Sequence, residues 1–231
     1  MYIHAIKMSE SKSNQSMRLK SQLCFLVAIL VSAHSIAGDL KISINTQKNQ
    51  PIESVVVTLE RLGGIQQSTS PAPLNIEIKQ IDREFVPAVT VIPVGSLVSF
   101  PNQDDILHHV YSFSKAKTFD LPLYKGIPNE PIEFDIAGVA TLGCNIHDWM
   151  SAYVVIVDTP YYQKTNQLGE AQLTNVSAGE YELVLWHPRQ KKSYRETITI
   201  GDQSTTKKIE LRLKPSFRSK RQNSNSNRRY Q

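Results

Sequence analysis

Apolar residues recur at every second position in several short segments of this sequence. Such alternation occurs at 40–44, 74–78, 181–185 and 209–213. Because successive side chains of a strand point to opposite faces of a sheet, this spacing predicts half-buried β-strands. Continuous β-branched runs at 55–59 and 153–157 are typical of strands that are buried on both faces.

Turn-forming residues separate these strands. They include Gly63-Gly64, Pro93-Val94-Gly95, Pro101-Asn102 and Gly201-Asp202. No apolar period of 3.6 residues appears beyond the first 37 residues. Many short strands with this punctuation predict an all-β protein built as antiparallel sandwiches or barrels. The length of 231 residues allows one large domain or two small ones.

The first 37 residues have the pattern of an export signal. A basic start at 17–20 precedes the apolar run 23–31, and Ser35 and Ala37 are small residues at the positions that a signal peptidase reads. We therefore expect a signal peptide over 1–37, with Met17 as an alternative start, and a periplasmic protein. The apolar run is short for a bilayer span, so a retained anchor is the weaker interpretation. Export would leave Cys144 as the single cysteine.

The net charge of +5 is unevenly distributed along the chain. Residues 1–37 carry four basic residues and one acidic residue, and 214–231 carry six basic residues and no acidic one. Of the 26 Lys and Arg and 21 Asp and Glu, 16 basic and 20 acidic residues remain for 38–213, a net charge of −4. The polar segment 214–231 has the composition of a disordered tail. A mildly acidic body removes nucleic acid from the expected partners.

Two segments carry the residues with metal chemistry. Cys144, His147 and Met150 lie within seven residues, and His108 and His109 lie upstream. Two imidazoles, one thiolate and one weak thioether form the donor set that copper takes in electron-transfer proteins. A structural zinc site would normally have paired cysteines. The sequence also lacks the G-x-S-x-G elbow of serine hydrolases and the His-x-His pairs expected of a multicopper oxidase.

These motifs resemble those of the cupredoxins, most closely the amicyanin and plastocyanin type and, more narrowly, the cupredoxin-like proteins of bacterial methylamine utilisation. The resemblance covers 74–158 and rests on the stretch from Phe100-Pro101-Asn102 to His108 and on the Cys-x-x-His-x-x-Met loop. It implies a Greek-key β-sandwich that binds one copper ion, cycling between Cu(I) and Cu(II). It also implies equatorial ligands His108, Cys144 and His147 and the axial ligand Met150.

Further residues around this centre have expected roles. Family members often have Asn directly after the first histidine, where this chain has His109, so His109 is expected to brace the ligand loops or to act as an alternative ligand. Asn102 is expected to support the ligand loop or to act as an alternative ligand. Trp149 is expected either to pack beneath the site or to form, together with Leu107, an apolar patch that docks redox partners. Asp104, Asp105 and Asp148 are candidates for an acidic rim around it.

The remaining segments resemble a second module. Residues 165–173 and 176–186 resemble the second half of a carboxypeptidase-regulatory-like or transthyretin-like sandwich, whose opening strands match 40–44 and 55–59. We therefore expect a small Ig- or transthyretin-like β-sandwich formed by 38–73 together with 159–213. The copper domain 74–158 would be inserted into it.

The expected function is that of a periplasmic mononuclear blue-copper protein. It would carry electrons between redox proteins such as a periplasmic cytochrome or a dehydrogenase, as a monomer without enzymatic activity and without a membrane span in the mature chain. Two alternatives remain open. One is copper binding and handling without redox turnover, and the other is a structural or carbohydrate-binding β-sandwich.

Overall fold

The computed structural model describes residues 37–63, 71–128 and 130–215. All regular elements within these ranges are β-strands, which confirms the all-β prediction. No helix in these ranges has the length and apolar character that crossing a bilayer requires. The expected signal peptide, apart from Ala37, and the expected basic tail beyond Pro215 lie outside the described residues.

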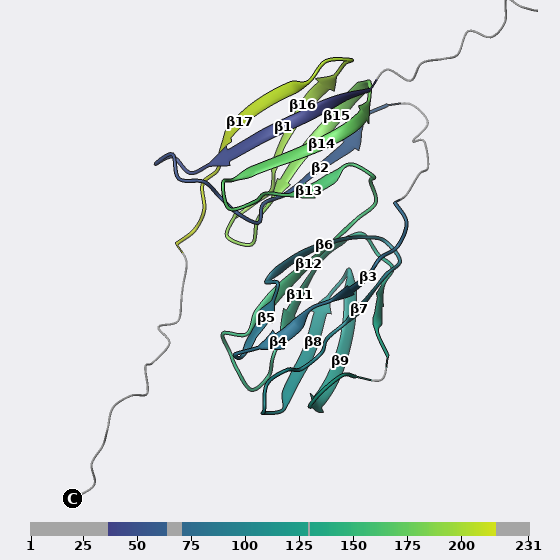
Figure 1. Cartoon of the computed structure of the whole chain (residues 1–231), viewed down its shortest axis with the longest axis vertical. Coiled ribbons are helices and arrows are strands. Elements are labelled where there is room, and N and C mark those ends of the chain that lie inside the picture. Colours follow the sequence, from purple (N-terminus) through teal and green to yellow (C-terminus); the bar gives the residue numbers. More distant parts are fainter. Residues whose placement is uncertain (1–36, 64–70, 129, 216–231) are drawn as a thin grey trace, which may run out of the picture. The chain divides into compact units, whose positions relative to one another are not determined.

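Two sheets combine strands from the beginning and the end of the described chain (Figure 1). The first has the order β14-β1-β17, formed by Glu170–Ser177, Ala37–Asn45 and Thr205–Glu210. The second has the order β13-β2-β15-β16, formed by Tyr162–Lys164, Val56–Arg61, Gly179–Trp186 and Tyr194–Ile200. β1 is antiparallel to β14 and parallel to β17.

These two sheets share one hydrophobic core and therefore form a sandwich. The alternation along β1 buries Leu40, Ile42 and Ile44, which belong to the same cluster as Leu59 of β2 and Leu183 of β15. Strands that precede and follow residues 74–158 thus pair in both sheets. An inserted domain requires such pairing, although the domain boundaries themselves stay a prediction.

A five-stranded sheet dominates the middle of the chain, with the order β6-β12-β11-β8-β9. Its strands are Val89–Pro93, Ser151–Val157, Gly138–Gly143, His108–Ser114 and Lys117–Tyr124. β6 and β12 are parallel, and the other pairs are antiparallel. A three-stranded sheet has the order β10-β7-β3, formed by Ile132–Phe134, Ser96–Ser99 and Asn75–Glu77. β4 (Lys79–Ile81) and β5 (Glu84–Val86) form a separate hairpin.

The core of this middle region includes two of the expected copper ligands. Phe100, Phe134 and Leu142 are fully buried in a cluster that also contains Cys144 and Met150. A further cluster of buried residues comprises Val56, Val89, Val155 and Val157. β12 is therefore buried on both faces, as its continuous β-branched sequence predicts.

Two strands differ in extent from the sequence prediction. The strand expected at 74–78 is reduced to Asn75–Glu77, and the strand expected at 209–213 begins earlier, at Thr205, and ends at Glu210. The ladder of β17 ends there because its partner β1 ends at Asn45, opposite Glu210. Leu211 is still 4% exposed, so the apolar alternation continues past the end of the strand.

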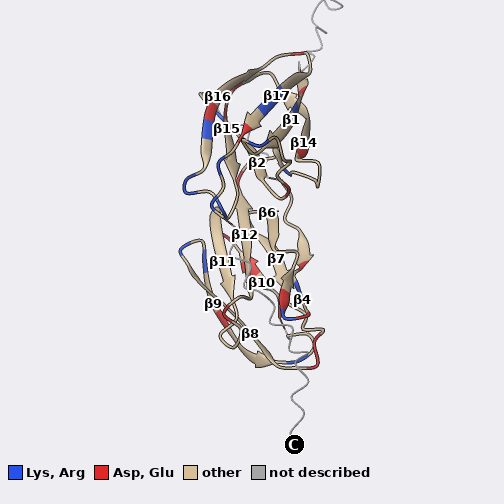
Figure 2. Ribbon diagram, turned by 90° about the vertical axis from the view of Figure 1, so that its left-hand side faces the viewer, with Lys and Arg blue, Asp and Glu red and all other residues tan. Residues whose placement is uncertain are grey.

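Charged residues of both signs are interspersed over the described strands (Figure 2). Several form pairs, such as Lys207 with Glu196 at 2.6 Å and Lys117 with Asp135 at 2.9 Å. Such exposed or half-exposed pairs contribute little to stability, typically below about 1 kcal/mol each.

Candidate metal centre

His108 is the first residue of β8 and is completely buried. The loop before it is fixed by Asn102, whose side-chain amide donates to the carbonyls of Ile106 and Tyr124, each at 2.8 Å. The Asn102 side-chain oxygen also accepts from the Asp104 amide at 3.0 Å. Asn102 therefore holds the conformation of the loop that leads to His108.

Cys144 and Met150 flank the loop that joins β11 to β12. The amide of His147 donates to the Cys144 carbonyl at 3.4 Å, and the amide of Met150 donates to the His147 carbonyl at 2.9 Å. These two backbone hydrogen bonds fold the loop into successive turns. The pairing of Gly143 with Ser151 closes the loop at its base. Within the loop, the His147 ring lies next to the Cys144 sulfur.

Three ligating groups converge at this end of the sheet. The ligand atoms of His108, Cys144 and His147 all lie within 4.8 Å of one another. The Cys144 Sγ atom is 3.9 Å from His108 Nδ1 and 3.8 Å from His147 Nδ1. The two imidazole rings are 5.0 Å apart between centroids. Met150 is 2% exposed and belongs to the same core cluster as Cys144.

The other nitrogen of His108 faces a carboxylate. Its Nε2 atom lies 2.7 Å from Asp104 Oδ2, so an Nε2–H tautomer donates this hydrogen bond and leaves Nδ1 free as a ligand. Metal-binding histidines usually have such a partner on their second nitrogen, which fixes the orientation of the ring. Sequence reasoning placed Asp104 only on an acidic rim and missed this contact.

Several groups around the centre have displaced pKa values. Burial acts to raise the pKa of Asp104, but hydrogen bonds from the Arg83 amide, from His108 and from the Asp82 amide outweigh it and hold this pKa below its usual value. Burial lowers the pKa of His147, and the charges of His108 and Arg83 lower it further. His147 is therefore biased towards the neutral imidazole that a metal requires.

Tyr124 forms part of the wall behind the His108 loop. Burial raises its pKa to about 12, against an opposing hydrogen bond from Gln80. The Gln80 side-chain amide donates to the Tyr124 hydroxyl at 2.6 Å and to the Phe100 carbonyl at 3.0 Å. Neither Gln80 nor Tyr124 stood out in the sequence, because their contacts join segments 20 to 44 residues apart.

The donor set fits a copper ion. Cys144 is a free and buried cysteine, with the ring nitrogens of His108 and His147 turned towards its sulfur. Two imidazoles and one thiolate with a thioether nearby suit copper in both of its oxidation states.

The structure places His109 apart from this cluster. Its Nε2 atom lies 2.8 Å from Asp120 Oδ1, and its ring packs 5.4 Å from the ring of Tyr111. The Nδ1 atom of His109 is buried and has no hydrogen-bond partner. Adjacent residues of a strand face opposite sides, which separates His109 from His108.

The two residues proposed for partner docking are exposed. Trp149 is 53% exposed, with its ring 5.3 Å from the His147 ring, and Leu107 is 46% exposed directly before His108. Ile106 and Ile146 are further exposed apolar residues of the same two loops.

No protein-family model and no curated protein matches this chain. Among solved structures, a purple cupredoxin from Nitrosopumilus maritimus is 25% identical, with a TM-score of 0.30 over 33% of this chain and 84% of that chain. A copper-containing nitrite reductase from Thermus scotoductus SA-01 is 21% identical, with a TM-score of 0.35 over 43% of this chain and 26% of that chain. A reduced amicyanin variant is 21% identical, with a TM-score of 0.32 over 36% of this chain and 81% of that chain. Each of these matches spans less than half of this chain, so the assignment of the metal centre rests on its own geometry.

Proposed function

We propose that this chain is a mononuclear type-1 copper protein of the cupredoxin type that carries single electrons between redox partners. The observation that carries the proposal is the convergence of His108, Cys144 and His147, with both Nδ1 atoms within 4 Å of the buried sulfur. Met150 lies in the same core cluster as Cys144 and would supply a weak thioether ligand.

In this proposal His108, Cys144 and His147 would hold the copper ion. Bound copper supplies the capacity to accept and release one electron. The chain supplies rigidity, because His108, Cys144 and Met150 lie at or directly beside the ends of paired strands and His108 is held through Asp104 and Asn102. A site that is fixed before binding needs little rearrangement when the oxidation state changes. A carrier of this kind has no substrate reaction of its own.

The apolar surface beside His147 is the proposed docking site for partners. Trp149, Leu107 and Ile146 are each about half exposed, and His147 is the ligand that lies least deeply. Electron-transfer complexes are transient and use small interfaces, for which such a patch suffices. A periplasmic cytochrome or a dehydrogenase, in the narrower form one of methylamine utilisation, is the proposed partner.

Copper binding with a Cys144 thiolate gives a decisive optical test. Purified protein from residue 38 to 231 is mixed with Cu(II), and its visible absorption and EPR spectra are recorded. We expect an intense blue absorption band with one copper per chain, and the loss of that band in Cys144→Ser. A Cys144→Ser protein that keeps the band would contradict the assigned ligand set.

The same titration separates the alternatives. Colourless binding of Cu(I) alone would indicate copper handling, and the absence of copper binding would favour a structural or carbohydrate-binding sandwich. Reversible one-electron oxidation and reduction at an electrode is expected for a carrier. Trp149→Ala should slow electron exchange with a partner cytochrome and leave the reduction potential unchanged, because Trp149 is exposed and is not a ligand.

Export to the periplasm is the proposed localisation. It is supported by the apolar run at 23–31 and the small residues Ser35 and Ala37. N-terminal sequencing of the protein recovered from a periplasmic extract should show a chain that begins at Gly38. Recovery of an uncleaved chain from the cytoplasm would contradict this localisation.

A further inference from the structure

We propose that the turn between β4 and β5 orients the ligand His108 indirectly, by holding the carboxylate of Asp104 against the His108 ring. This inference rests on the proposed function, since it concerns the same centre. It assigns Asp104 as a positioning residue, and it assigns the turn residues Asp82 and Arg83 a role that is carried by their backbone amides and not by their side chains.

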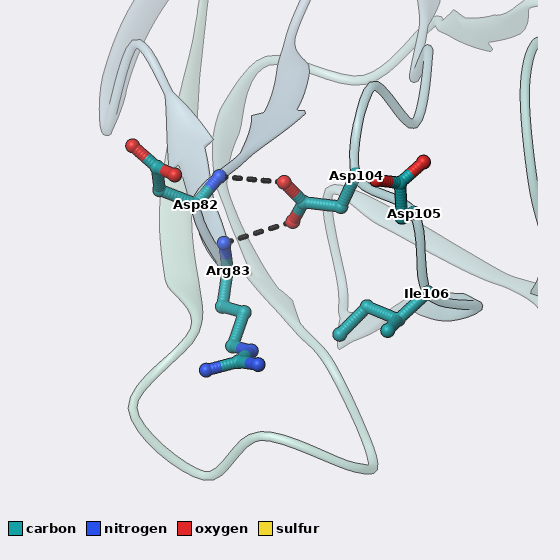
Figure 3. Close-up of a pocket in the computed structure, with 5 residues that line it drawn as sticks. All are labelled: Asp82, Arg83, Asp104, Asp105 and Ile106. Atoms are coloured by element: carbon teal, nitrogen blue, oxygen red, sulfur yellow. Dashed lines mark hydrogen bonds between the residues drawn. The ribbon is translucent and has the colours of Figure 1, made fainter. Parts of the chain in front are cut away.

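One carboxylate connects the turn to the ligand. The amide of Asp82 donates to Asp104 Oδ1 at 2.7 Å, and the amide of Arg83 donates to Asp104 Oδ2 at 2.8 Å (Figure 3). The same Oδ2 atom lies 2.7 Å from His108 Nε2. Both oxygens of Asp104 are therefore engaged, and the carboxylate cannot rotate without breaking several charge-assisted hydrogen bonds.

The backbone conformation of the turn explains why both amides point to one carboxylate. Asp82 and Arg83 have φ values of 54° and 61°, in the left-handed region, and Ile81 pairs with Glu84 across the two-residue loop. Positive φ at both central residues is the pattern of a type I′ hairpin turn. Successive amides in such a turn can form a concave anion site, and here the anion is a side chain of the same protein.

The hairpin itself is anchored to the core. Phe85 of β5 is 3% exposed and belongs to the core cluster that contains Cys144. Gln80 of β4 is fully buried. Its backbone amide donates to the Pro101 carbonyl at 2.9 Å, and its backbone carbonyl accepts from the Gln103 backbone amide at 2.9 Å. The turn thus has a fixed position relative to the segment that leads to Asp104.

Asp104 lies between this anchored turn and the ligand. Together with Asp82, Arg83, Asp105 and Ile106 it lines an open pocket of about 420 Å³. The pocket leaves the outer side of Asp104 open, so the turn amides and His108 provide its orientation. Without them the carboxylate could turn outwards into the pocket.

We call the two turn amides together with the Asp104 carboxylate that they hold against His108 the clamp. The clamp affects the electron density of the His108 ring as well as its orientation. A carboxylate that accepts a hydrogen bond from Nε2–H makes the imidazole a stronger donor at Nδ1. A stronger donor stabilises Cu(II) more than Cu(I). Weakening the clamp should therefore shift the redox equilibrium towards Cu(I) and raise the reduction potential.

Three variants test this inference. Asp104→Asn removes the negative charge and places an amide group against one of the two turn amides. Asp82→Pro removes one turn amide and excludes the positive φ. The double variant Asp82→Asn with Arg83→Lys is the matched control, because it keeps both backbone amides, retains the positive charge that acts on His147, and places at the first turn position a residue that suits the left-handed conformation.

We expect Asp104→Asn and Asp82→Pro each to favour Cu(I) by about tenfold, which corresponds to about 59 mV for a one-electron couple. The double variant should keep the wild-type potential. Wild-type potentials in Asp104→Asn, or in an Asp82→Pro protein whose thermal unfolding shows that it is folded, would overturn the inference. A double variant that shifts as far as Asp82→Pro would also overturn it, because the side chains would then be responsible.

A measurement on copper-free protein keeps this test separate from the proposed function. Nitrogen-15 NMR of the His108 ring should show a single Nε2–H tautomer in the wild type and in the double variant. It should show a mixture of tautomers in Asp104→Asn and Asp82→Pro. If the wild type binds no copper, the proposed function fails while the tautomer result still decides whether the turn holds His108. A mixture already present in the wild type would refute the clamp.

Discussion

At the scale of single residues, the clearest contrast is between the two adjacent histidines at the start of β8. His108 faces the buried sulfur of Cys144, whereas His109 faces Asp120 on the other side of the strand. We expect His109→Gln to keep the copper-to-protein ratio and the visible spectrum of the wild type. His108→Gln should lose the blue band, because one of the three converging ligand atoms is removed. Metal analysis and absorption spectra check both variants, and loss of the band in His109→Gln would show that His109 is a ligand.

The residues of this centre differ in how far the sequence alone can identify them. Cys144, His147 and Met150 share one short loop, so their spacing alone predicts that they lie together. His108 was chosen over His109 only through a family resemblance. Asp104 was not identified as its partner although it lies four residues before His108, because the amides that turn its carboxylate towards His108 come from a turn 21 and 22 residues upstream. Spacing within a loop can be read from a sequence, but a contact between two loops depends on the fold.

At the scale of strands, Thr165 joins segments that lie far apart in the sequence. Its hydroxyl accepts from the Val55 amide at 2.9 Å and donates to the Ile52 carbonyl at 2.8 Å, and Thr165 is 2% exposed. Thr165→Val keeps the shape but leaves two buried backbone groups unpaired. We expect the free energy of unfolding to fall by about 2 kcal/mol.

Thr165→Ser is the control for that variant, since it keeps the hydroxyl and loses only a methyl group, at a cost of about 1 kcal/mol. Urea denaturation followed by circular dichroism gives both values. Equal losses in the two variants would mean that the hydroxyl does not stabilise the pairing of the segments around 52–55 and 165.

The strands themselves were predicted where burial imposes a regular pattern. β1, β2, β12 and β15 coincide closely with the alternating or continuous apolar segments. β9 was missed because it alternates only between half-buried and exposed positions, and Pro122 lies within it. The parallel pairing of β1 with β17 and of β6 with β12 cannot be read from periodicity, since each joins strands that are distant in the sequence.

At the scale of the whole molecule, the stability of the fold should depend on pH through His187, outside the metal centre. The Arg189 amide donates to His187 Nδ1 at 3.2 Å, a bond that requires this nitrogen to be unprotonated. Burial, and secondarily the charge of Arg189, lower the pKa of His187 from 6.5 to about 4. Between these values the unfolded chain binds a proton that the folded chain does not. Stability therefore falls as the pH decreases from about 6.5, and the loss is complete below about 4.

The size of this loss follows from the same two pKa values. Each pKa unit corresponds to about 1.4 kcal/mol, which gives an upper limit of about 3 kcal/mol. Because the side chain is partly exposed, solvent screening should reduce the effect to about 1 kcal/mol.

His187→Asn keeps an acceptor for the Arg189 amide and does not titrate. Urea unfolding of copper-free protein at pH 7 and pH 4 should show the wild type losing about 1 kcal/mol more than the variant. The lowered pKa of His147 acts in the same direction but is common to both proteins and cancels in the difference. Equal losses in the two proteins would mean that His187 accepts a proton in the folded state without cost.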